Sequence, residues 1–323
     1  MFLVTGGAGF IGSNLVGALC ARGAEVTVCD RLRDGEKWRH LAPHPIAGIV
    51  PPEELDRWLD GASEIEGILH LGAISATTVR DGDLVAANNL TLTLKLWDWC
   101  AEYRVPLIYA SSAATYGDGS RGFDDDMDPA ALAQLQPLNL YGWSKHATDR
   151  RVADLLARGR MAPPQWAGLK FFNVYGPNED HKGRMASVVR HKFLQIAAGE
   201  PATLFASDRE GVEDGGQQRD FVHVDDCVAA MLWLIDHHRV SGLFNCGSGT
   251  ARSFRDLALA VFAAMGREPD IRYVPMPDDL RGKYQYFTEA RMDRLRAAGF
   301  TQAPTTLEAG VTSYVQSMMK DAA

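Results

Sequence analysis

The sequence predicts an α/β protein with a doubly wound parallel sheet of the Rossmann type and a smaller C-terminal α/β lobe. Three observations predict this fold class. Short apolar runs alternate with longer helical patterns, a glycine-rich turn joins the first run to the first helix, and 323 residues are enough for about two domains. Of these residues 46% are hydrophobic and 23% are charged, which is typical of a globular protein.

The first elements form a strand–turn–helix–strand unit. An apolar run over 2–5 is followed by a predicted helix over 10–22 and a second β-rich run over 25–30. This is the size of one βαβ crossover, about thirty residues. We predict further strands at 66–71, 106–111, 168–174 and 242–246, and further helices at 85–104, 144–157 and 185–198. Such alternation predicts a parallel sheet with helices on both faces.

The turn TGGAGFIG lies directly between the first predicted strand and the first helix. Gly6, Gly9 and Gly12 lack a Cβ, so backbone N–H groups can approach a pyrophosphate at the helix N-terminus. Asp30 follows at the end of the second strand, close to the spacing of the acidic residue that binds a ribose in this motif. The turn therefore predicts a bound dinucleotide, in preference to a tight turn with no ligand.

The loop after Asp30 bears on which dinucleotide binds. Asp30 by itself favours NAD, because its carboxylate can accept hydrogen bonds from ribose hydroxyls. Arg31, Arg33 and Lys37 follow within one loop, and a guanidinium beside the ribose can pair with a 2′-phosphate. We predict NADP, with NAD as the less favoured cofactor and a solvated basic loop as the alternative without function.

Tyr141 and Lys145 have the spacing YxxxK in a predicted helix, so both side chains lie on one face. A phenol with a pKa of about 10 is a poor base at neutral pH, but a nearby ammonium and a positive nicotinamide ring would favour the phenolate. Ser111 and Ser112 in YASSAATYG end a predicted strand, where ligands bind in open α/β sheets. Ser112 can orient a substrate alcohol toward Tyr141, which predicts an alcohol-oxidising site.

Composition and charge exclude several other classes. The net charge of −8 gives no support to a nucleic-acid or anionic-membrane partner. The five cysteines are odd in number and never spaced CxxC, which argues against a disulfide framework or a zinc site, and we predict no metal. No apolar run reaches the length of a membrane span, and MFLVTGG leads straight into the first strand without a signal peptide. We expect a cytoplasmic enzyme.

The order of glycine turn, strand-end serine and YxxxK resembles the extended short-chain dehydrogenase/reductases. Within them the chain resembles the ADP-L-glycero-D-manno-heptose 6-epimerases almost from end to end, in peptides that include DGEKW, PLNLYGWSK, FFNVYGPNEDHKGRMASV, RDFVHVDD and LRGKYQYFT. HKGRMAS and LRGKYQ are the discriminating ones. The resemblance implies a bound, recycled NADP, transient oxidation of the heptose C6 hydroxyl and hydride return to the opposite face, in lipopolysaccharide core synthesis.

The resemblance also implies residue roles. Tyr141 would be the acid/base on one face of C6 and Lys182 the second one, while Lys145 orients the nicotinamide ribose. A dehydrogenase that releases its reduced cofactor needs no second base, so Lys182 separates these two functions. The residues implied for the cofactor are Gly6, Gly9, Phe10, Ile11, Gly12, Asp30, Arg31, Lys37, Leu71, Gly72, Ala73, Ile74, Ser75, Asn88, Lys145 and Val174. Those implied for the ADP-heptose are Ser112, Asn173, Arg184, His191, Phe205, Ala206, Ser207, Asp208, Arg219 and Tyr284.

The same resemblance implies a homo-oligomer, in this family a pentamer. We expect residues 1–172 to form the NADP-binding domain, with 220–247 returning to it, and 173–323 to form mainly the substrate lobe. Another nucleotide-sugar enzyme such as a 4-epimerase remains an alternative. A dehydratase is less favoured, because Ala113 and Ala114 follow Ser112 where dehydratases carry an acidic pair. A non-catalytic dinucleotide sensor is disfavoured by the intact YxxxK pair.

Overall fold

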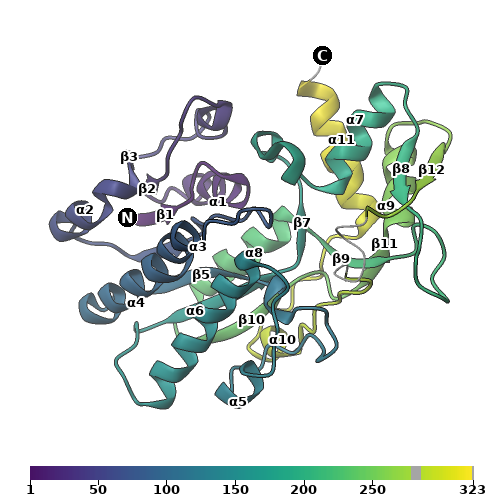
Figure 1. Cartoon of the computed structure of the whole chain (residues 1–323). Helices are drawn as coiled ribbons and strands as arrows, with labels where there is room; N and C mark the ends of the chain where they lie inside the picture. Colours follow the sequence, from purple (N-terminus) through teal and green to yellow (C-terminus); the bar gives the residue numbers. More distant parts are fainter. Residues whose placement is uncertain (278–284, 322–323) are drawn as a thin grey trace.

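Six strands from residues 2–171 and one strand at 242–246 build a seven-stranded sheet, shown with the rest of the computed structural model in Figure 1. The structure describes residues 1–277 and 285–321. The strands of the sheet are β1 (Phe2–Thr5), β2 (Val26–Cys29), β3 (Gly48–Val50), β4 (Gly67–His70), β5 (Leu107–Ser112), β6 (Trp166–Phe171) and β10 (Gly242–Cys246). They are all parallel, in the order β10-β6-β5-β4-β1-β2-β3. The predicted Rossmann-type α/β fold is confirmed.

Helices cover both faces of this sheet. The main ones are α1 (Phe10–Ala21), α2 (Leu55–Gly61), α4 (Leu92–Tyr103), α6 (Leu140–Ala157) and α8 (Val224–Asp236). Alternate residues of β1 belong to the two cores: Val4 packs with α1 and α8, and Leu3 packs with α2, α4 and α6. Each is completely buried, which is worth about 1.5–3 kcal/mol per side chain.

A second lobe, beside the large sheet in Figure 1, is built on smaller sheets. β7 (Asn173–Tyr175), β9 (Gln218–His223) and β11 (Ala251–Ser253) form one, and β8 (Ala202–Phe205) pairs with β12 (Ile271–Val274). Its core includes residues of α7 (Val188–Ala197), α9 (Phe254–Ala264) and α11 (Leu307–Asp321). The short helices α3 (Gly82–Val85), α5 (Pro129–Leu132) and α10 (Asp293–Ala297) complete the α-helices of the described residues.

Three predicted elements differ in the structure. The helix predicted over 85–104 is α3, a π-helical turn over Ala86–Thr91 and then α4. The strand predicted over 168–174 divides into β6 and β7, because β7 leaves the large sheet to pair with β9. The stretch 220–247 divides likewise: β9 lies in the small sheet, and only β10 joins the large one.

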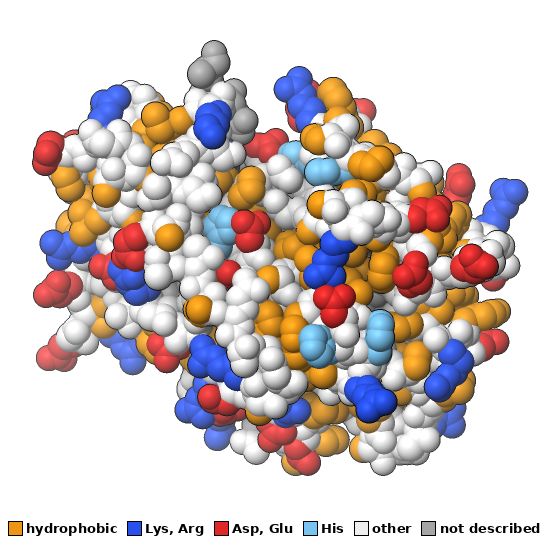
Figure 2. Space-filling view, turned by 180° about the vertical axis from the view of Figure 1, so that it is seen from behind, with side chains coloured by type: hydrophobic (Ala, Val, Ile, Leu, Met, Phe, Trp, Pro, Cys, Tyr) orange, Lys and Arg blue, Asp and Glu red, His pale blue; other side chains and the backbone are white. Residues whose placement is uncertain are grey.

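The distribution of surface charge and the length of the apolar helices concern two possible partners, nucleic acid and the membrane. On the face shown in Figure 2, acidic and basic side chains are interspersed among hydrophobic ones, and the described residues of this face form no broad basic field. Within the described part of the chain, no helix has both the length and the apolar character needed to cross a membrane.

A chain of hydrogen bonds holds the carboxyl end of β4 to β1. The Thr5 hydroxyl accepts from Gly72 N and contacts His70 Nδ1 at 2.7 Å, while His70 Nε2 lies 2.9 Å from Thr93 Oγ1. Thr93 Oγ1 in turn donates to the Asn89 carbonyl oxygen, so it accepts from His70 and the ring is the neutral Nε2–H tautomer. Burial lowers the pKa of His70 to about 3.

We expect His70→Leu to reduce the free energy of unfolding by about 1–3 kcal/mol, because it leaves two buried hydroxyls without their partner. The folded pKa of about 3 lies below the ordinary 6.5, so the contribution of His70 is complete above pH 6.5 and is lost as the pH falls toward 3. Urea denaturation at pH 7 and pH 4.5 would measure both effects. The exposed His238→Leu is the matched control, and an equal loss there would contradict the assignment.

Candidate active site

The candidate site lies at the carboxyl edge of the large sheet. The glycine turn follows β1, the loop from Leu71 follows β4, and Ser112 ends β5. Because the strands are parallel, these ends meet at one edge, which is where ligands bind in open α/β sheets.

The glycine turn depends on two positions without side chains. Gly6 has φ +68°, and a Cβ there would lie 2.6 Å from Gly72 N. A Cβ on Gly12 would collide with the carbonyl oxygen of Gly6. The turn is therefore packed against the loop after β4, and the N-terminus of α1 begins directly behind it.

The start of α6 places the tyrosine and the lysine of the YxxxK motif. Asn139 caps this helix by accepting a hydrogen bond from Gly142 N, and Gly142 lets the helix approach the carbonyl of Ala114. Tyr141 thereby hydrogen-bonds the hydroxyl of Ser112. The structure thus brings together two of the residues predicted to act on the substrate alcohol.

Electrostatics at this pair differ from the prediction in one respect. Burial raises the pKa of Tyr141, and the Ser112 hydroxyl only partly opposes it. Lys145 Nζ donates to the Ala110 carbonyl at 2.8 Å, and burial lowers the pKa of this ammonium to about 8. The chain's own groups therefore favour a neutral phenol, and a positive charge brought by a cofactor is what would favour the phenolate.

Beneath Tyr141 and Lys145 lies a buried ion pair that the sequence analysis missed. Asp149 Oδ2 accepts from Lys170 Nζ at 2.9 Å and from Ser111 Oγ at 2.7 Å, and both charged side chains are completely buried. Asp149 raises the pKa of Lys145 and so opposes the effect of burial. A signal was available, because Asp149 is four residues beyond Lys145 and shares its helix face.

The residues predicted to contact the ribose form a small charge cluster. Asp30 Oδ2 accepts from Ala8 N in the glycine turn at 3.0 Å, and Asp30 Oδ1 pairs with Lys37 Nζ at 2.6 Å. Arg31 Nε pairs instead with the exposed Glu53 at 2.6 Å. Lys37 therefore neutralises the Asp30 carboxylate that would face a ribose. Arg31, on the same loop, is exposed to solvent.

Asn89 fixes the loop that follows β4. Its side-chain oxygen accepts from Ile74 N at 2.8 Å and its amide donates to the Ile74 carbonyl at 2.9 Å and to Ser144 Oγ at 2.9 Å. The predicted cofactor residue Asn88 is next to it and donates to the carbonyl of Leu84. Asn88 remains the predicted cofactor residue, whereas its fully buried neighbour Asn89, which was not predicted, shapes the loop.

Lys182 lies against the start of α1. It belongs to a short helical segment over Asp180–Met185, and its Nζ is 5.1 Å from the centre of the Phe10 ring. Burial lowers the pKa of this ammonium, and Glu179 opposes the effect. Lys182 and Phe10, which the sequence analysis assigned to substrate chemistry and to the cofactor, are therefore neighbours.

The residues predicted to line the substrate come from several segments of the second lobe. Asp208 N bonds the hydroxyl of Tyr286, and Ser207 N donates to Asp214. Arg219 is buried on β9 with its guanidinium 5.6 Å from the Phe254 ring. On β7, Asn173 is exposed and Val174 beside it is half-buried. Arg184 is exposed, and the ring of His191 on α7 lies 3.3 Å from its carbonyl oxygen. Phe205 and Ala206 are half-buried at the end of β8. Tyr284 lies outside the described residues.

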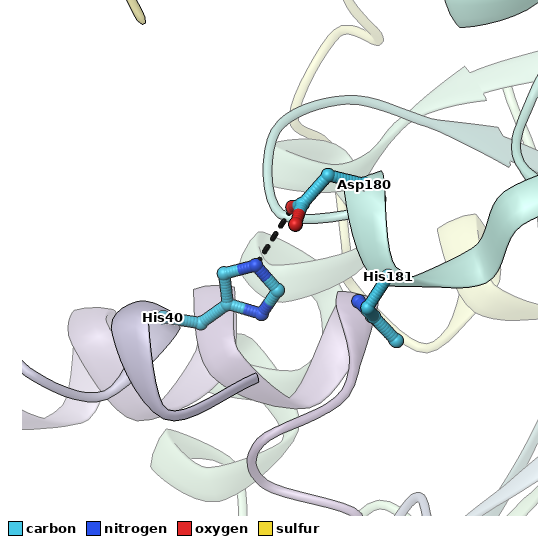
Figure 3. Close-up of side chains that lie close together, drawn as sticks. All are labelled: His40, Asp180 and His181. Atoms are coloured by element: carbon cyan, nitrogen blue, oxygen red, sulfur yellow. Dashed lines mark hydrogen bonds and ion pairs between the residues drawn. The ribbon is translucent and has the colours of Figure 1, made fainter. Parts of the chain in front are cut away.

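A further cluster joins segments far apart in the sequence (Figure 3). His40 ends the short helix Glu36–His40, and its Nε2 lies 2.7 Å from Asp180 Oδ1. His181 lies beside them, and the metal-ligating atoms of the three residues are all within 4.8 Å of one another. Burial lowers the pKa of His181, and His40, Lys37 and Lys182 add to this effect, so the surroundings disfavour a cation and we assign this cluster no metal.

Comparisons with known proteins show which family shares this sequence. The model of the NAD dependent epimerase/dehydratase family matches residues 2–247. An ADP-L-glycero-D-manno-heptose-6-epimerase from Nitratidesulfovibrio vulgaris (strain DP4) is 47% identical over 99% of this chain and 98% of its own length. One from Fusobacterium nucleatum subsp. nucleatum is 44% identical, over 99% and 98%. The resemblance seen in the peptides is confirmed over nearly the whole chain.

Solved structures share the fold. The crystal structure of the Helicobacter pylori ADP-L-glycero-D-manno-heptose-6-epimerase has a TM-score of 0.79 at 26% identity, covering 98% of this chain and 96% of that one. The UDP-glucose 4-epimerase of Thermus thermophilus, a complex with NAD, has a TM-score of 0.77 at 29% identity, covering 98% and 97%. The fold is thus common to enzymes that act at different sugar carbons.

We expect Lys170→Met to reduce the free energy of unfolding by about 3–5 kcal/mol, because it leaves the carboxylate of Asp149 buried without its partner. The matched control is Lys95→Met, which breaks the exposed pair with Asp56 and should cost less than about 1 kcal/mol. Chemical denaturation of both variants measures the difference. Equal losses would show that the buried pair has no special role.

Proposed function

This chain belongs to the NAD dependent epimerase/dehydratase family, and from that membership we propose that it interconverts ADP-D-glycero- and ADP-L-glycero-β-D-manno-heptose in lipopolysaccharide core heptose synthesis. The observation that carries the proposal is the identity of 44–47% to heptose 6-epimerases over nearly the full length of both proteins. The discriminating peptides HKGRMAS and LRGKYQ are also present.

The glycine turn fits a nicotinamide dinucleotide. There is no room for a Cβ at Gly6 or Gly12. Helix α1 begins within this turn, at Phe10, so its first backbone N–H groups are where a pyrophosphate would bind. The bound dinucleotide would take up and return the hydride. The residues proposed to hold it are those of the turn with Phe10 and Ile11, then Asp30, Arg31, Lys37, Leu71–Ser75, Asn88, Lys145 and Val174.

Tyr141 is the first acid/base of the proposed reaction. Ser112, hydrogen-bonded to the phenol, orients the C6 hydroxyl of the heptose. Tyr141 takes the hydroxyl proton of one epimer as C6 becomes a ketone, and Lys182 gives a proton to the same oxygen when the alcohol of the other epimer forms. In the reverse direction the two residues exchange these roles. Lys145, with its pKa of about 8, holds the ribose and adds positive charge beside the phenol while it is protonated.

Lys182 is the second acid/base. Inversion at C6 requires proton-transfer groups on both sides of this carbon, and a lysine whose pKa is lowered by burial is better suited to proton transfer near neutral pH. Gly183 follows with φ +52°, so the backbone bends directly after the lysine. A dehydrogenase that releases its reduced cofactor would need no such residue.

NADP is the cofactor we propose, with NAD less favoured. The pairing of Lys37 with Asp30 removes the negative charge that would repel a 2′-phosphate. Arg31 lies on the same loop, and its exposed guanidinium, which pairs through Nε with Glu53, is the group we propose to contact that phosphate.

The second lobe would bind the ADP-heptose. Guanidinium groups pair well with pyrophosphate, which supports Arg184 and Arg219 as ligands. The other residues proposed for the substrate are Asn173, His191, Phe205–Asp208 and Tyr284. Residues 1–172 with the returning β10 form the cofactor domain in this proposal, and the homo-oligomer is a pentamer, which sedimentation velocity would test.

We expect the purified protein, without added NADP, to invert C6 of ADP-D-glycero-β-D-manno-heptose, as followed by proton NMR. Tyr141→Phe and Lys182→Met should each reduce inversion by at least a factor of about 100, since each removes one proton-transfer group, while the bound nucleotide stays at the wild-type level. No inversion together with good turnover of UDP-glucose would favour a 4-epimerase. Near-normal inversion by Lys182→Met would remove the second acid/base.

We expect Lys37→Met to weaken NADP binding by a factor of about 10–100, which corresponds to the loss of about 1.5–3 kcal/mol from a hydrogen bond to a charged group. NAD binding should change much less, because Asp30 then faces the ribose unpaired. Calorimetric titration of the nucleotide-free protein measures both affinities. Arg39→Met, on the exposed side of the same loop, is the control, and equal losses for both nucleotides would contradict the NADP assignment.

A further inference from the structure

His40 contacts two parts of the proposed active site at once. Its Nε2 lies 2.7 Å from Asp180 Oδ1, and its Nδ1 lies 3.4 Å from the carbonyl oxygen of Ala8 in the glycine turn. His40 is 8% exposed, whereas Asp180 is exposed, so the contact sits where the interior meets the surface. Figure 3 shows the His40 ring reaching across from its own segment to the one that carries Asp180.

Asp180 stands two residues before Lys182 in the same short helical segment. The chain just before it is fixed to α1 by two side-chain hydrogen bonds. Asn14 Nδ2 donates to the Pro177 carbonyl at 3.0 Å, and Asn178 Nδ2 donates to Ser13 Oγ at 3.1 Å. The His40–Asp180 contact fixes the same stretch of chain at a third place, two residues before Lys182.

On its other side, His40 follows the segment that would bind the cofactor ribose. Lys37, which neutralises Asp30, lies three residues earlier in the same short helix. One contact therefore links the ribose segment to the segment of the second acid/base. Both partners of His40 are acceptors, so a neutral ring can donate to only one of them, and the shorter contact is the one to Asp180.

We propose that His40 is a positioning residue that holds Lys182 in place through Asp180, and so makes the placement of the second acid/base depend on the ribose-binding segment. The inference rests on the proposed function of Lys182. It concerns placement rather than folding, because the carboxylate that His40 contacts belongs to an exposed residue, Asp180.

The kinetic test compares His40→Leu, His40→Gln, Asp180→Ala and the double variant His40→Leu/Asp180→Ala. We expect His40→Leu to lower kcat for heptose inversion at least tenfold, since a small misplacement of a catalytic group has effects of about this size or larger, with KM within about twofold. His40→Gln, whose amide can still donate to Asp180, should recover most of kcat. The double variant should lose no more than either single variant, because both remove one contact.

Arg39→Leu is the matched control, since it changes the neighbouring exposed residue of the same short helix. The inference is overturned if kcat of His40→Leu stays within twofold of wild type, if Arg39→Leu loses as much, or if the losses at positions 40 and 180 are additive.

A second readout needs no turnover. The acylation rate of the Lys182 amine by acetic anhydride, measured by mass spectrometry of its peptide, should rise severalfold in His40→Leu but not in His40→Gln. The rate at Lys145, held on the Ala110 carbonyl, should not change. If the wild-type protein turns over no heptose, the proposed function fails, yet this measurement still decides whether His40 fixes Lys182. An unchanged rate at Lys182 overturns the inference.

Discussion

The close approach of two loops at the carboxyl edge of the sheet is the constraint on which the rest of the site depends. Gly6 touches the backbone of Gly72, and Gly12 touches the carbonyl of Gly6, so neither position has room for a side chain. This contact sets where α1 begins, and α1 then provides the fixed points for the segment at 177–182. Cofactor turn and second acid/base are thus positioned by one short piece of backbone.

Two buried polar networks support this edge in different ways. Around His70 every group is neutral, and each donor meets an acceptor, so the network can be rigid at little electrostatic cost. Beneath Tyr141 the network is charged, and Asp149 acts on the pKa of both Tyr141 and Lys145 in addition to pairing with Lys170. The first network holds the shape of the site, whereas the second also sets its charge.

The features that could be predicted from the sequence are those that depend on residues close together in the chain. The strands around the glycine turn follow from periodicity, which is local. Ser112 and Tyr141 each had a local signal of their own, a strand end and the YxxxK spacing. Asn89 and Asp149 had local signals as well, a second asparagine and a helical repeat, but choosing them requires knowing which face is buried. His40 and Asp180 are 140 residues apart, and nothing in either segment indicates that they meet. The small sheets of the second lobe were not predicted for the same reason, because their strands are short and pair with strands far away in the sequence.

The position of β10 has a consequence for how the chain is made. β6 is completed by residue 171, but its outer neighbour β10 spans Gly242–Cys246, after much of the second lobe has been synthesised. A nascent chain that has already built the cofactor turn therefore carries β6 as an open edge with unpaired N–H and C=O groups. Open edges of this kind invite pairing with other chains. The return of the chain to the first domain thus closes a route to aggregation, and a truncation before residue 242 would leave that route open.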